Sequence, residues 1–358
     1  MPRLAVSKSA SVIVGLSGGV DSAVAAYLLQ QQGYAVRAVF MKNFTPREYE
    51  FLECPSFEDR RVAYAVAKHL KIPIETWDLE KHYRQKVLAY LYREYRAGRT
   101  PNPDVVCNNE IKFQVFLQLA LKQKADYIAT GHYARIKKTS KEYLLLKGRD
   151  LTKDQSYFLS GLNQNQLQQS LFPLGELTKK DVRALAKKIK LPNHDRPDSQ
   201  GLCFVGQVKM QKFLQAKIKP KPGDIVDTAG NIVGRHPGVY FFTIGQRQGL
   251  NLGGGPIRYV VGKDLKKNQL IVGEISNRKL YRKTVNVSDW HWVGLLLTLP
   301  LKVKSKLRYR QPDQVCQIKQ IRQGRATVLF SQPQRAVTPG QIAVFYRGAQ
   351  LIASATIR

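Results

Sequence analysis

The sequence predicts an α/β domain with a parallel sheet, followed by a small central domain and a C-terminal antiparallel β-barrel. In the first half of the chain, short apolar runs alternate with amphipathic stretches. Beyond Gly206, proline and glycine recur every few residues, as in small β structure with many loops. From Lys283 onward, apolar and polar residues alternate with a period of two, which is typical of antiparallel strands. We therefore expect domains at residues 1–206, 207–282 and 283–358.

The first element is a strand over residues 11–16, which enters a Ser-Gly-Gly turn and continues as a helix from Asp21. The strand is β-branched and continuously apolar, as expected of a buried parallel strand. Gly18 and Gly19 allow backbone N–H groups to point at a ligand, and the helix adds the positive end of its dipole. The motif SGGVDS therefore predicts a phosphate site. Its spacing is neither G-x-x-x-x-G-K-[ST] nor G-x-G-x-x-G, and an ordinary glycine-rich turn is the alternative.

The elements that follow alternate between strand and helix. Ser56, with Asp59 three residues later, predicts the start of the second helix. Right-handed crossovers place the carboxyl ends of parallel strands on one rim, so Met41 and Gly131 are expected beside SGGVDS. A core methionine and a turn glycine are the alternatives. We expect strands at 34–41, 74–79 and 126–130, and helices at 56–70, about 82–97 and about 112–123.

The charge balance indicates the kind of partner. The chain of 358 residues has 58 Lys and Arg against 26 Asp and Glu, a formal net charge of +32 that is spread along its whole length. Such a surface predicts a polyanion whose binding weakens as salt rises; a solvated basic surface without this role is the alternative. No signal peptide pattern and no apolar stretch of 18 residues occurs, so we expect a cytoplasmic protein without a membrane partner.

One strand of the expected barrel has a basic residue at every second position. In LKVKSKLRYR, residues 301–310, alternation puts all five basic side chains on one face. Alternate strand residues lie about 6.6 to 6.8 Å apart, so this face is suited to follow successive phosphates of RNA. A solvated outer face is the alternative. The five residues are Lys302, Lys304, Lys306, Arg308 and Arg310.

Two cysteine neighbourhoods are candidates for the reactive chemistry. Cys107 follows Asp104 by three residues in AGRTPNPDVVCNNEIKF and stands just ahead of a helix expected to begin near Ile111. Cys203 lies between two glycines in DSQGLCFVG, in a loop that can move. A buried, inert thiol is the alternative for each.

The other two cysteines, Cys54 and Cys316, are expected to be inert. The four cysteines show neither C-x-x-C nor a spacing with histidine that would indicate zinc or an iron–sulfur cluster. Structural disulfides are not expected in a reducing compartment.

Taken together, the motifs resemble those of the tRNA-specific 2-thiouridylase family along essentially the whole chain. The family implies a pyrophosphate-loop domain of the adenine nucleotide alpha hydrolase type, a small central domain, and a C-terminal barrel, which jointly hold the anticodon arm of tRNA. The stretch 45–53 offers little motif to match. The motifs are GLSGGVDS, FMKN, AGRTPNPDVVCN with EIKF, ADYIATGHYAR, KDQSYFL, FPLGELTK, DSQGLCFVG, FTIGQRQGL, YRQPD and TPGQIAVFY.

The resemblance implies ATP-dependent replacement of O2 of the wobble uridine by sulfur. Adenylation turns that oxygen into a leaving group, with Mg²⁺ bound through the ATP phosphates and Asp21 as a candidate ligand. Sulfur would arrive as a persulfide on Cys203, from a cysteine desulfurase or a persulfide carrier protein. Cys107 would be the nucleophile or resolving thiol that leaves a disulfide with Cys203, and Asp104 would move protons.

The resemblance also implies that the substrates are the tRNAs for lysine, glutamate and glutamine. It further implies which residues contact each ligand. The residues expected at ATP are Gly15, Leu16, Ser17, Gly18, Gly19, Val20, Asp21, Ser22, Met41 and Gly131. Those expected at the target base are Asn102, Pro103 and Asp104. Those expected at the rest of the tRNA are His132, Lys153, Asp154, Gln155, Arg308, Tyr309 and Gln341.

Two other classes of function are alternatives. Another pyrophosphate-loop synthetase or ligase, acting on a small molecule, would share the first motif but has no use for the basic surface or the two cysteines. A non-catalytic RNA-binding protein would have kept a nucleotide fold without its chemistry. Pyrophosphate release that depends strictly on tRNA would exclude both.

Overall fold

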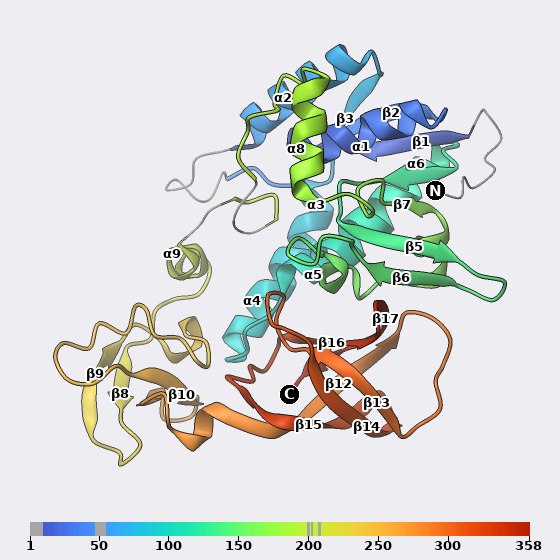
Figure 1. Ribbon diagram of the computed structural model, residues 1–358. Coiled ribbons are helices and arrows are strands. Elements are labelled where there is room, and N and C mark those ends of the chain that lie inside the picture. Colours follow the sequence, from blue (N-terminus) through green and yellow to red (C-terminus); the bar gives the residue numbers. More distant parts are fainter. Residues whose placement is uncertain (1–9, 47–54, 199–200, 202, 207–208) are drawn as a thin grey trace.

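The computed structural model describes residues 10–46, 55–198, 201, 203–206 and 209–358. Figure 1 shows a parallel sheet with its helices, a small β-rich part built largely from the yellow segment, and an orange-red barrel. Within the described residues, no helix is long and apolar enough to cross a membrane.

The first part contains the parallel sheet that the alternating pattern predicts. Its strand order is β3-β2-β1-β4-β7, and every neighbouring pair is parallel. The last strand has only two residues and was not predicted, because so short a run shows no periodicity. The strands are β1 (Ser11–Gly15), β2 (Ala35–Lys42), β3 (Ile74–Asp78), β4 (Tyr127–Ala129) and β7 (Ser170–Leu171).

One face of this sheet is covered by α1 (Val20–Gln31), α2 (Pro55–Leu70) and α8 (Lys179–Lys188). Val12 and Val14 of β1 point into this core, whereas Ile13 points into the core on the opposite face. The sheet is therefore buried on both faces, as its continuous apolar runs require. Helix α2 begins at Pro55, one residue before the start predicted at Ser56.

Two long helices cover the opposite face. The first runs continuously through α3 (Glu80–Tyr83), the π-helical η1 (Arg84–Leu88) and α4 (Ala89–Arg96). The second runs through α5 (Pro103–Cys107), the π-helical η2 (Asn108–Phe116) and α6 (Leu117–Lys122).

The second helix begins about nine residues earlier than the sequence pattern predicted. Asn102 is its N-cap, and its Oδ1 accepts a hydrogen bond from the N–H of Val105 at 3.2 Å. Pro103 occupies the first helical position, where no N–H is needed. The Asn-Pro pair is thus a helix start and not a continuation of the loop. Cys107 consequently lies inside the helix, and its predicted place ahead of a helix starting near Ile111 is wrong.

A hairpin that was not predicted extends from the first part toward the barrel. It consists of β5 (Ala134–Lys138) and β6 (Tyr143–Lys147). Strand β6 pairs with β17, the last strand of the chain, so backbone hydrogen bonds join the first part to the barrel. The chain then passes through η3 (Ser156–Leu159) and α7 (Gln164–Gln168).

The central part is small and rich in loops, as predicted. It has a four-stranded sheet in the order β10-β11-β8-β9, and its apolar side joins the core of the first part. For example, Phe213 stacks on Tyr92 of α4 with ring centroids 6.0 Å apart. Its elements are α9 (Met210–Gln215), β8 (Gly223–Val226), β9 (Ile232–His236), η4 (Val239–Phe241), β10 (Tyr259–Asp264), β11 (Gln269–Gly273) and η5 (Arg278–Leu280).

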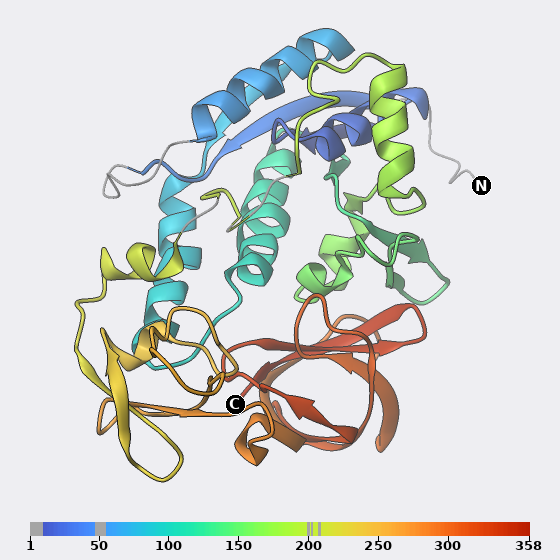
Figure 2. The same ribbon diagram turned by 60° about the vertical axis from the view of Figure 1, so that its left-hand side comes forward.

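The C-terminal strands form the antiparallel barrel that the period of two predicts. The order β12-β15-β14-β13-β16-β17 closes because β12 also pairs with β17. Figure 2 shows the closed barrel beside the central part and below the parallel sheet. Its core contains alternate residues such as Val303, Ile318 and Phe345. The strands are β12 (Tyr281–Trp292), β13 (Leu301–Lys306), β14 (Gln314–Arg322), β15 (Arg325–Arg335), β16 (Ile342–Arg347) and β17 (Gln350–Ile357).

Candidate active site

The loop between β1 and α1 is shaped to receive an anion. Gly18 has φ +80°, and its carbonyl oxygen accepts hydrogen bonds from the side chains of Asn193 at 2.9 Å and Arg196 at 3.2 Å. A Cβ at Gly18 would lie 2.5 Å from the carbonyl oxygen of Asp59. Gly19, at the N-cap of α1, has no side chain that would occupy the first N–H groups of the helix. The backbone therefore offers donors and a helix N-terminus at one place.

Met41 and Gly131 flank this loop on the same rim, as predicted from the position of Met41 at the end of β2 and of Gly131 just after β4. A Cβ at Gly15 would lie 2.9 Å from Cε of Met41, and one at Gly131 would lie 2.7 Å from the backbone of Asp21. The side chain of Met41 is also largely buried in the core. The structure thus gathers all the residues expected at ATP along a single rim, from Gly15 to Ser22 with Met41 and Gly131.

Asp21 belongs to a chain of ion pairs that leads away from the loop. Its Oδ1 accepts a hydrogen bond from the hydroxyl of Tyr133 at 2.8 Å, and Lys179 of α8 contacts both carboxylate oxygens at 2.7 and 2.9 Å. Lys179 also lies 2.7 Å from Asp198, which begins the segment that carries Cys203. The phosphate loop and the cysteine segment therefore share one lysine.

Asp198 is held as a carboxylate by several cations. Burial alone would raise its pKa, but hydrogen bonds from Lys179 and Lys153 together with the charges of Lys179 and Arg183 hold the pKa far below its ordinary value. The expected RNA-contacting residue Lys153 is thus paired at 2.9 Å with Asp198.

The two candidate cysteines meet. Sγ of Cys107 lies 3.6 Å from Sγ of Cys203, although 96 positions separate them in sequence. Cys107 is fully buried in the helix, whereas Cys203 is partly accessible. The backbone at Cys203 is tied on both sides, because its N–H donates to Oδ1 of Asp104 at 3.1 Å and its carbonyl accepts from the hydroxyl of Tyr83 at 2.7 Å. Both thiols are free, at a separation from which a disulfide requires only a small approach.

The two thiols differ in acidity because one donates a hydrogen bond to the other. The hydrogen bond from Cys107 and the positive charge of Lys112 lower the pKa of Cys203, although burial opposes this. Burial raises the pKa of Cys107 well above its ordinary value, and the contact with Cys203 raises it further. Cys203 is therefore the thiol that ionises first, and the thiolate is the nucleophilic form.

Lys112 is a site residue that the sequence analysis missed. Burial alone would lower its pKa, but the charges of Cys203, Cys107 and Asp104 raise it. Its Nζ lies 5.5 Å from the ring centroid of Phe204, beside the thiols. The sequence offered only a lysine five positions after Cys107. The structure adds that this segment is π-helical, with hydrogen bonds that join residues five apart.

The residues expected at the target base lie at the start of the same helix. Burial raises the pKa of Asp104, partly offset by the N–H of Cys203, which suits a group that takes and returns a proton. Gln341 of the barrel donates to the carbonyls of Thr100 and Pro101, both at 3.0 Å, and its Oε1 accepts from Asn102 at 3.5 Å. The structure thus brings Gln341, from the far end of the chain, beside Asn102.

Three of the residues expected at tRNA are turned inward. His132 is buried between the rings of Phe113 and Phe172, and burial lowers its pKa well below the ordinary value. The buried carboxylate of Asp154 accepts from the N–H groups of Gly148 and Ser156. Gln155 accepts from the N–H of Tyr133 at 3.0 Å. The contacts of these three side chains are thus with neighbouring parts of the chain.

The basic strand is shorter than predicted. Strand β13 ends at Lys306, and residues 307–310 bend away, so the prediction of one continuous cationic face is wrong. Lys302 and Lys304 are exposed, but Lys306 turns toward Asp154 and Asp313, at 3.9 and 4.0 Å. Beyond the bend, Arg308 and Arg310 are exposed.

Tyr309 and Arg308, both expected at tRNA, lie at this bend. The ring of Tyr309 packs on Phe158 at 4.3 Å between centroids. Arg308 donates to the carbonyl of Arg335 at 3.0 Å.

Cys316 takes no part in this site. Burial in the barrel raises the pKa of Cys316 to about 12, consistent with an inert thiol. Cys54 lies outside the described residues. Within the described ranges, no group of three or more His, Cys, Asp or Glu side chains is arranged to hold a metal ion.

Three family models match consecutive stretches of the chain. They describe a tRNA methyl transferase HUP domain at residues 10–207, a tRNA methyl transferase PRC-barrel domain at 211–274, and an aminomethyltransferase beta-barrel domain at 282–357.

Several curated relatives match nearly the full chain, and each is named tRNA-specific 2-thiouridylase MnmA. The protein of Legionella pneumophila (strain Lens) is 45% identical over 97% of this chain and 98% of its own length. That of Hydrogenovibrio crunogenus is 46% identical, covering 97% and 93%. That of Geobacillus thermodenitrificans is 45% identical, covering 97% and 94%.

Proposed function

The chain belongs to the tRNA-specific 2-thiouridylase family, and on that premise we propose that it replaces O2 of the wobble uridine in tRNA anticodons with sulfur at the expense of ATP. The observation that carries the proposal is the pair of free thiols 3.6 Å apart, with Asp104 and Lys112 against them. The expected tRNAs are those for lysine, glutamate and glutamine.

The thiol pair also favours sulfur transfer over the methyl transfer that two of the matched domain descriptions mention. A persulfide sulfur must gain two electrons before it can replace a carbonyl oxygen. When Cys107 attacks Sγ of a Cys203 persulfide, hydrosulfide leaves and a Cys107–Cys203 disulfide forms, so the two thiols supply those electrons. Hydrosulfide then adds at C2 of the activated base, and adenylate departs with the oxygen. An external reductant of the dithiol class restores the pair.

Activation of the base is assigned to the loop from Ser17 to Ser22. Its backbone donors and the N-terminus of α1 would stabilise the pyrophosphate that leaves when the uridine oxygen takes the adenylyl group. The carboxylate of Asp21 is an oxygen ligand of the kind that Mg²⁺ prefers beside substrate phosphates, and the ion would neutralise charge on the leaving group. Met41 and Gly131 are assigned to adenine.

We propose that each of the three expected domains has its own part in this scheme. Residues 1–206 would carry the ATP site and both cysteines, 207–282 would form the central domain, and 283–358 would form the tRNA-binding barrel. A cysteine desulfurase or a persulfide carrier would deliver sulfur to Cys203, the residue of the pair that is partly exposed and whose pKa is lowered.

The test separates the two cysteine roles. Cys107→Ser and Cys203→Ser should both fail to form 2-thiouridine in tRNA given ATP and a persulfide donor, as measured by mass spectrometry of the anticodon nucleosides. They should fail differently. Cys107→Ser should still carry a persulfide at position 203, whereas Cys203→Ser should carry no transferable sulfur.

The controls for this test are within the chain. The Cys54→Ser/Cys316→Ser variant should remain active, and peptide mapping after one turnover without reductant should find the Cys107–Cys203 disulfide. A persulfide found on Cys107 would reverse the two roles. Pyrophosphate release without tRNA would favour the synthetase that acts on a small molecule.

A further inference from the structure

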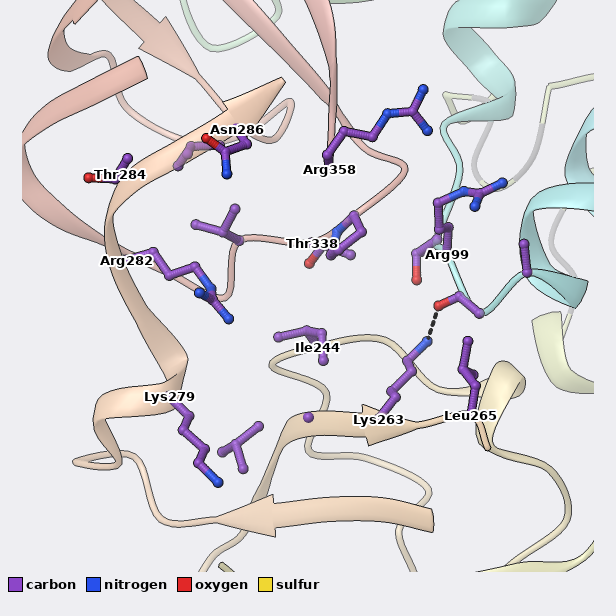
Figure 3. Close-up of a pocket in the computed structure, with 18 residues that line it drawn as sticks. Arg99, Ile244, Lys263, Leu265, Lys279, Arg282, Thr284, Asn286, Thr338 and Arg358 are labelled. Atoms are coloured by element: carbon purple, nitrogen blue, oxygen red, sulfur yellow. Dashed lines mark hydrogen bonds between the residues drawn. The ribbon is translucent and has the colours of Figure 1, made fainter. Parts of the chain in front are cut away.

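A cavity of about 510 Å³ lies where the three parts of the chain meet. Its walls come from the loop after α4, from β10 of the central part, and from the barrel at β12, the β15–β16 loop and the C-terminal residue. Figure 3 shows Arg282 of β12 and Lys263 of β10 reaching toward the same space from opposite walls. None of the residues expected to bind ATP, the target base or tRNA lines this cavity.

All charged residues that line the cavity are basic. They are Arg99, Lys263, Lys279, Arg282 and Arg358, and hydroxyl and amide side chains such as Thr338 and Asn286 accompany them. Arg99 is paired with Glu94 at 2.5 and 3.0 Å, and Arg358 with Asp289 at 3.1 Å. For Lys263, Lys279 and Arg282, no carboxylate partner exists among the described residues.

Lys263 sets this cavity apart from the generally basic surface. Its Nζ donates to the carbonyl of Gly98 at 3.0 Å, a neutral acceptor, and burial lowers its pKa to about 8. A half-buried cation without a countercharge is unfavourable unless an anion binds beside it. Binding of an anion beside Lys263 is therefore more favourable than binding of the same anion beside an exposed lysine.

The wall nearest Lys263 leads directly to the proposed target-base residues. Gly98 has φ +73°, and a Cβ there would lie 2.6 Å from Leu265, so this loop is seated against the central part. Two residues later, the N–H of Thr100 donates to the carbonyl of Pro339 at 2.9 Å. The chain then runs without interruption into Asn102, the cap of the helix that carries Cys107.

We propose that this cavity binds a backbone phosphate of the tRNA next to the target uridine, held by Lys263, Lys279 and Arg282. The inference rests on the proposed function and adds a contact site to it. Among the described residues, no aromatic side chain lines the cavity, so it has no surface on which a base would stack. That composition favours a phosphodiester over a free nucleotide. A phosphate here would also tie the central part and the barrel to the loop before the catalytic helix.

The experiment uses the full chain with Lys279→Gln and Arg282→Gln combined, because both side chains are exposed and their loss leaves no buried charge unpaired. The matched control combines Lys187→Gln and Lys188→Gln on the exposed side of α8, which removes the same charge from a distant surface (Figure 1). Lys263→Met is a third variant that keeps the aliphatic stem. Thermal unfolding verifies that each variant is folded.

The variant with both cavity substitutions should bind unmodified tRNA about tenfold more weakly than the control. The slope of log K against log salt should fall by about 0.7 to 0.9 for each phosphate that the variant no longer neutralises. Ethylation interference identifies the tRNA phosphates whose ethylation blocks binding. In the cavity variant, ethylation of only one or two of these phosphates, next to the wobble position, should no longer affect binding. Lys263→Met should lose sensitivity at the same phosphates.

Three results would overturn the inference. One is a cavity variant that has the ethylation map of the unaltered chain and binds tRNA as tightly as the control variant. Another is a uniform loss of sensitivity along the tRNA, which indicates only bulk charge. The third is binding of inorganic pyrophosphate that disappears in the cavity variant while its tRNA map is unchanged, which would make the cavity a site for a free anion. Pyrophosphate release by the unaltered chain with tRNA is measured in parallel and tests the proposed function separately.

Discussion

At the scale of single residues, the site gives two identical side chains different acidities. Cys107 donates its proton toward Cys203, so burial and hydrogen bonding raise the pKa of the first while the contact and Lys112 lower that of the second. The thiolate is the form that accepts sulfur from a donor. The environment, and not the residue type, therefore sets the difference in acidity on which the two proposed roles rest.

Lys112 should control when Cys203 ionises. Replacing it with Gln removes the positive charge that lowers the pKa of Cys203, so alkylation of Cys203 by iodoacetamide should slow at pH 7 and its pH profile should move to higher pH. Lys112→Arg keeps the charge and should keep the profile near that of the unaltered chain. Peptide mapping of alkylated Cys203 measures both. Equal profiles for the Gln and Arg variants would remove Lys112 from the site.

At the scale of elements, the phosphate loop owes its shape to contacts outside its own strand and helix. The carbonyl of Gly18 is held by Asn193 and Arg196, which follow α8, and its φ is in the left-handed region. Gly33, after α1, has a similar φ of +89°, but a Cβ placed there would have no atom within 4 Å. These two glycines therefore share a left-handed φ but differ in their surroundings.

This pair allows a matched test of the loop. Ala at either position should lower the free energy of unfolding by about 1 to 2 kcal/mol, because a left-handed conformation is unfavourable for alanine. Only Gly18→Ala should also lose ATP binding in calorimetry, because its Cβ would push against the carbonyl of Asp59 2.5 Å away. Full ATP affinity in Gly18→Ala would place the nucleotide elsewhere.

At the scale of the whole molecule, the barrel is joined to the first part by more than a connecting chain. Strand β6 pairs with β17, and Lys147 of β6 contacts both carboxylate oxygens of Asp313 at 2.7 and 2.6 Å. The ring of Tyr346 lies 4.3 Å from the same ammonium group. Lys147 is 9% exposed at its side chain, so this ion pair is largely removed from water.

Breaking that ion pair should weaken the attachment of the barrel. Asp313→Asn leaves the buried ammonium of Lys147 without its countercharge, which should lower the free energy of unfolding by about 3 kcal/mol. Lys147→Met combined with Asp313→Leu removes both charges and should recover most of that loss. Urea unfolding of the single and double variants measures the difference. A single variant as stable as the unaltered chain would show that water reaches this lysine.

Local periodicity and local motifs were sufficient to predict several elements and the anion site. Continuous apolar runs predicted the parallel strands, alternation predicted the barrel, and SGGVDS predicted a strand, turn and helix with an anion site, because these patterns express which side of a short element is buried. The start of the second long helix was also encoded locally, by Asn102 and Pro103, but its proline-rich surroundings resembled a loop.

Contacts between distant positions could not be predicted from these local patterns and are seen only in the folded chain. It placed Cys107 and Cys203 3.6 Å apart, added Lys112 to them, and paired the β5–β6 hairpin with the last strand. It also turned Lys306 away from the predicted basic face toward Asp313. The physical reason is the same in each case: a pattern along the chain specifies the face that a residue occupies, whereas its partner depends on how separately specified faces pack together.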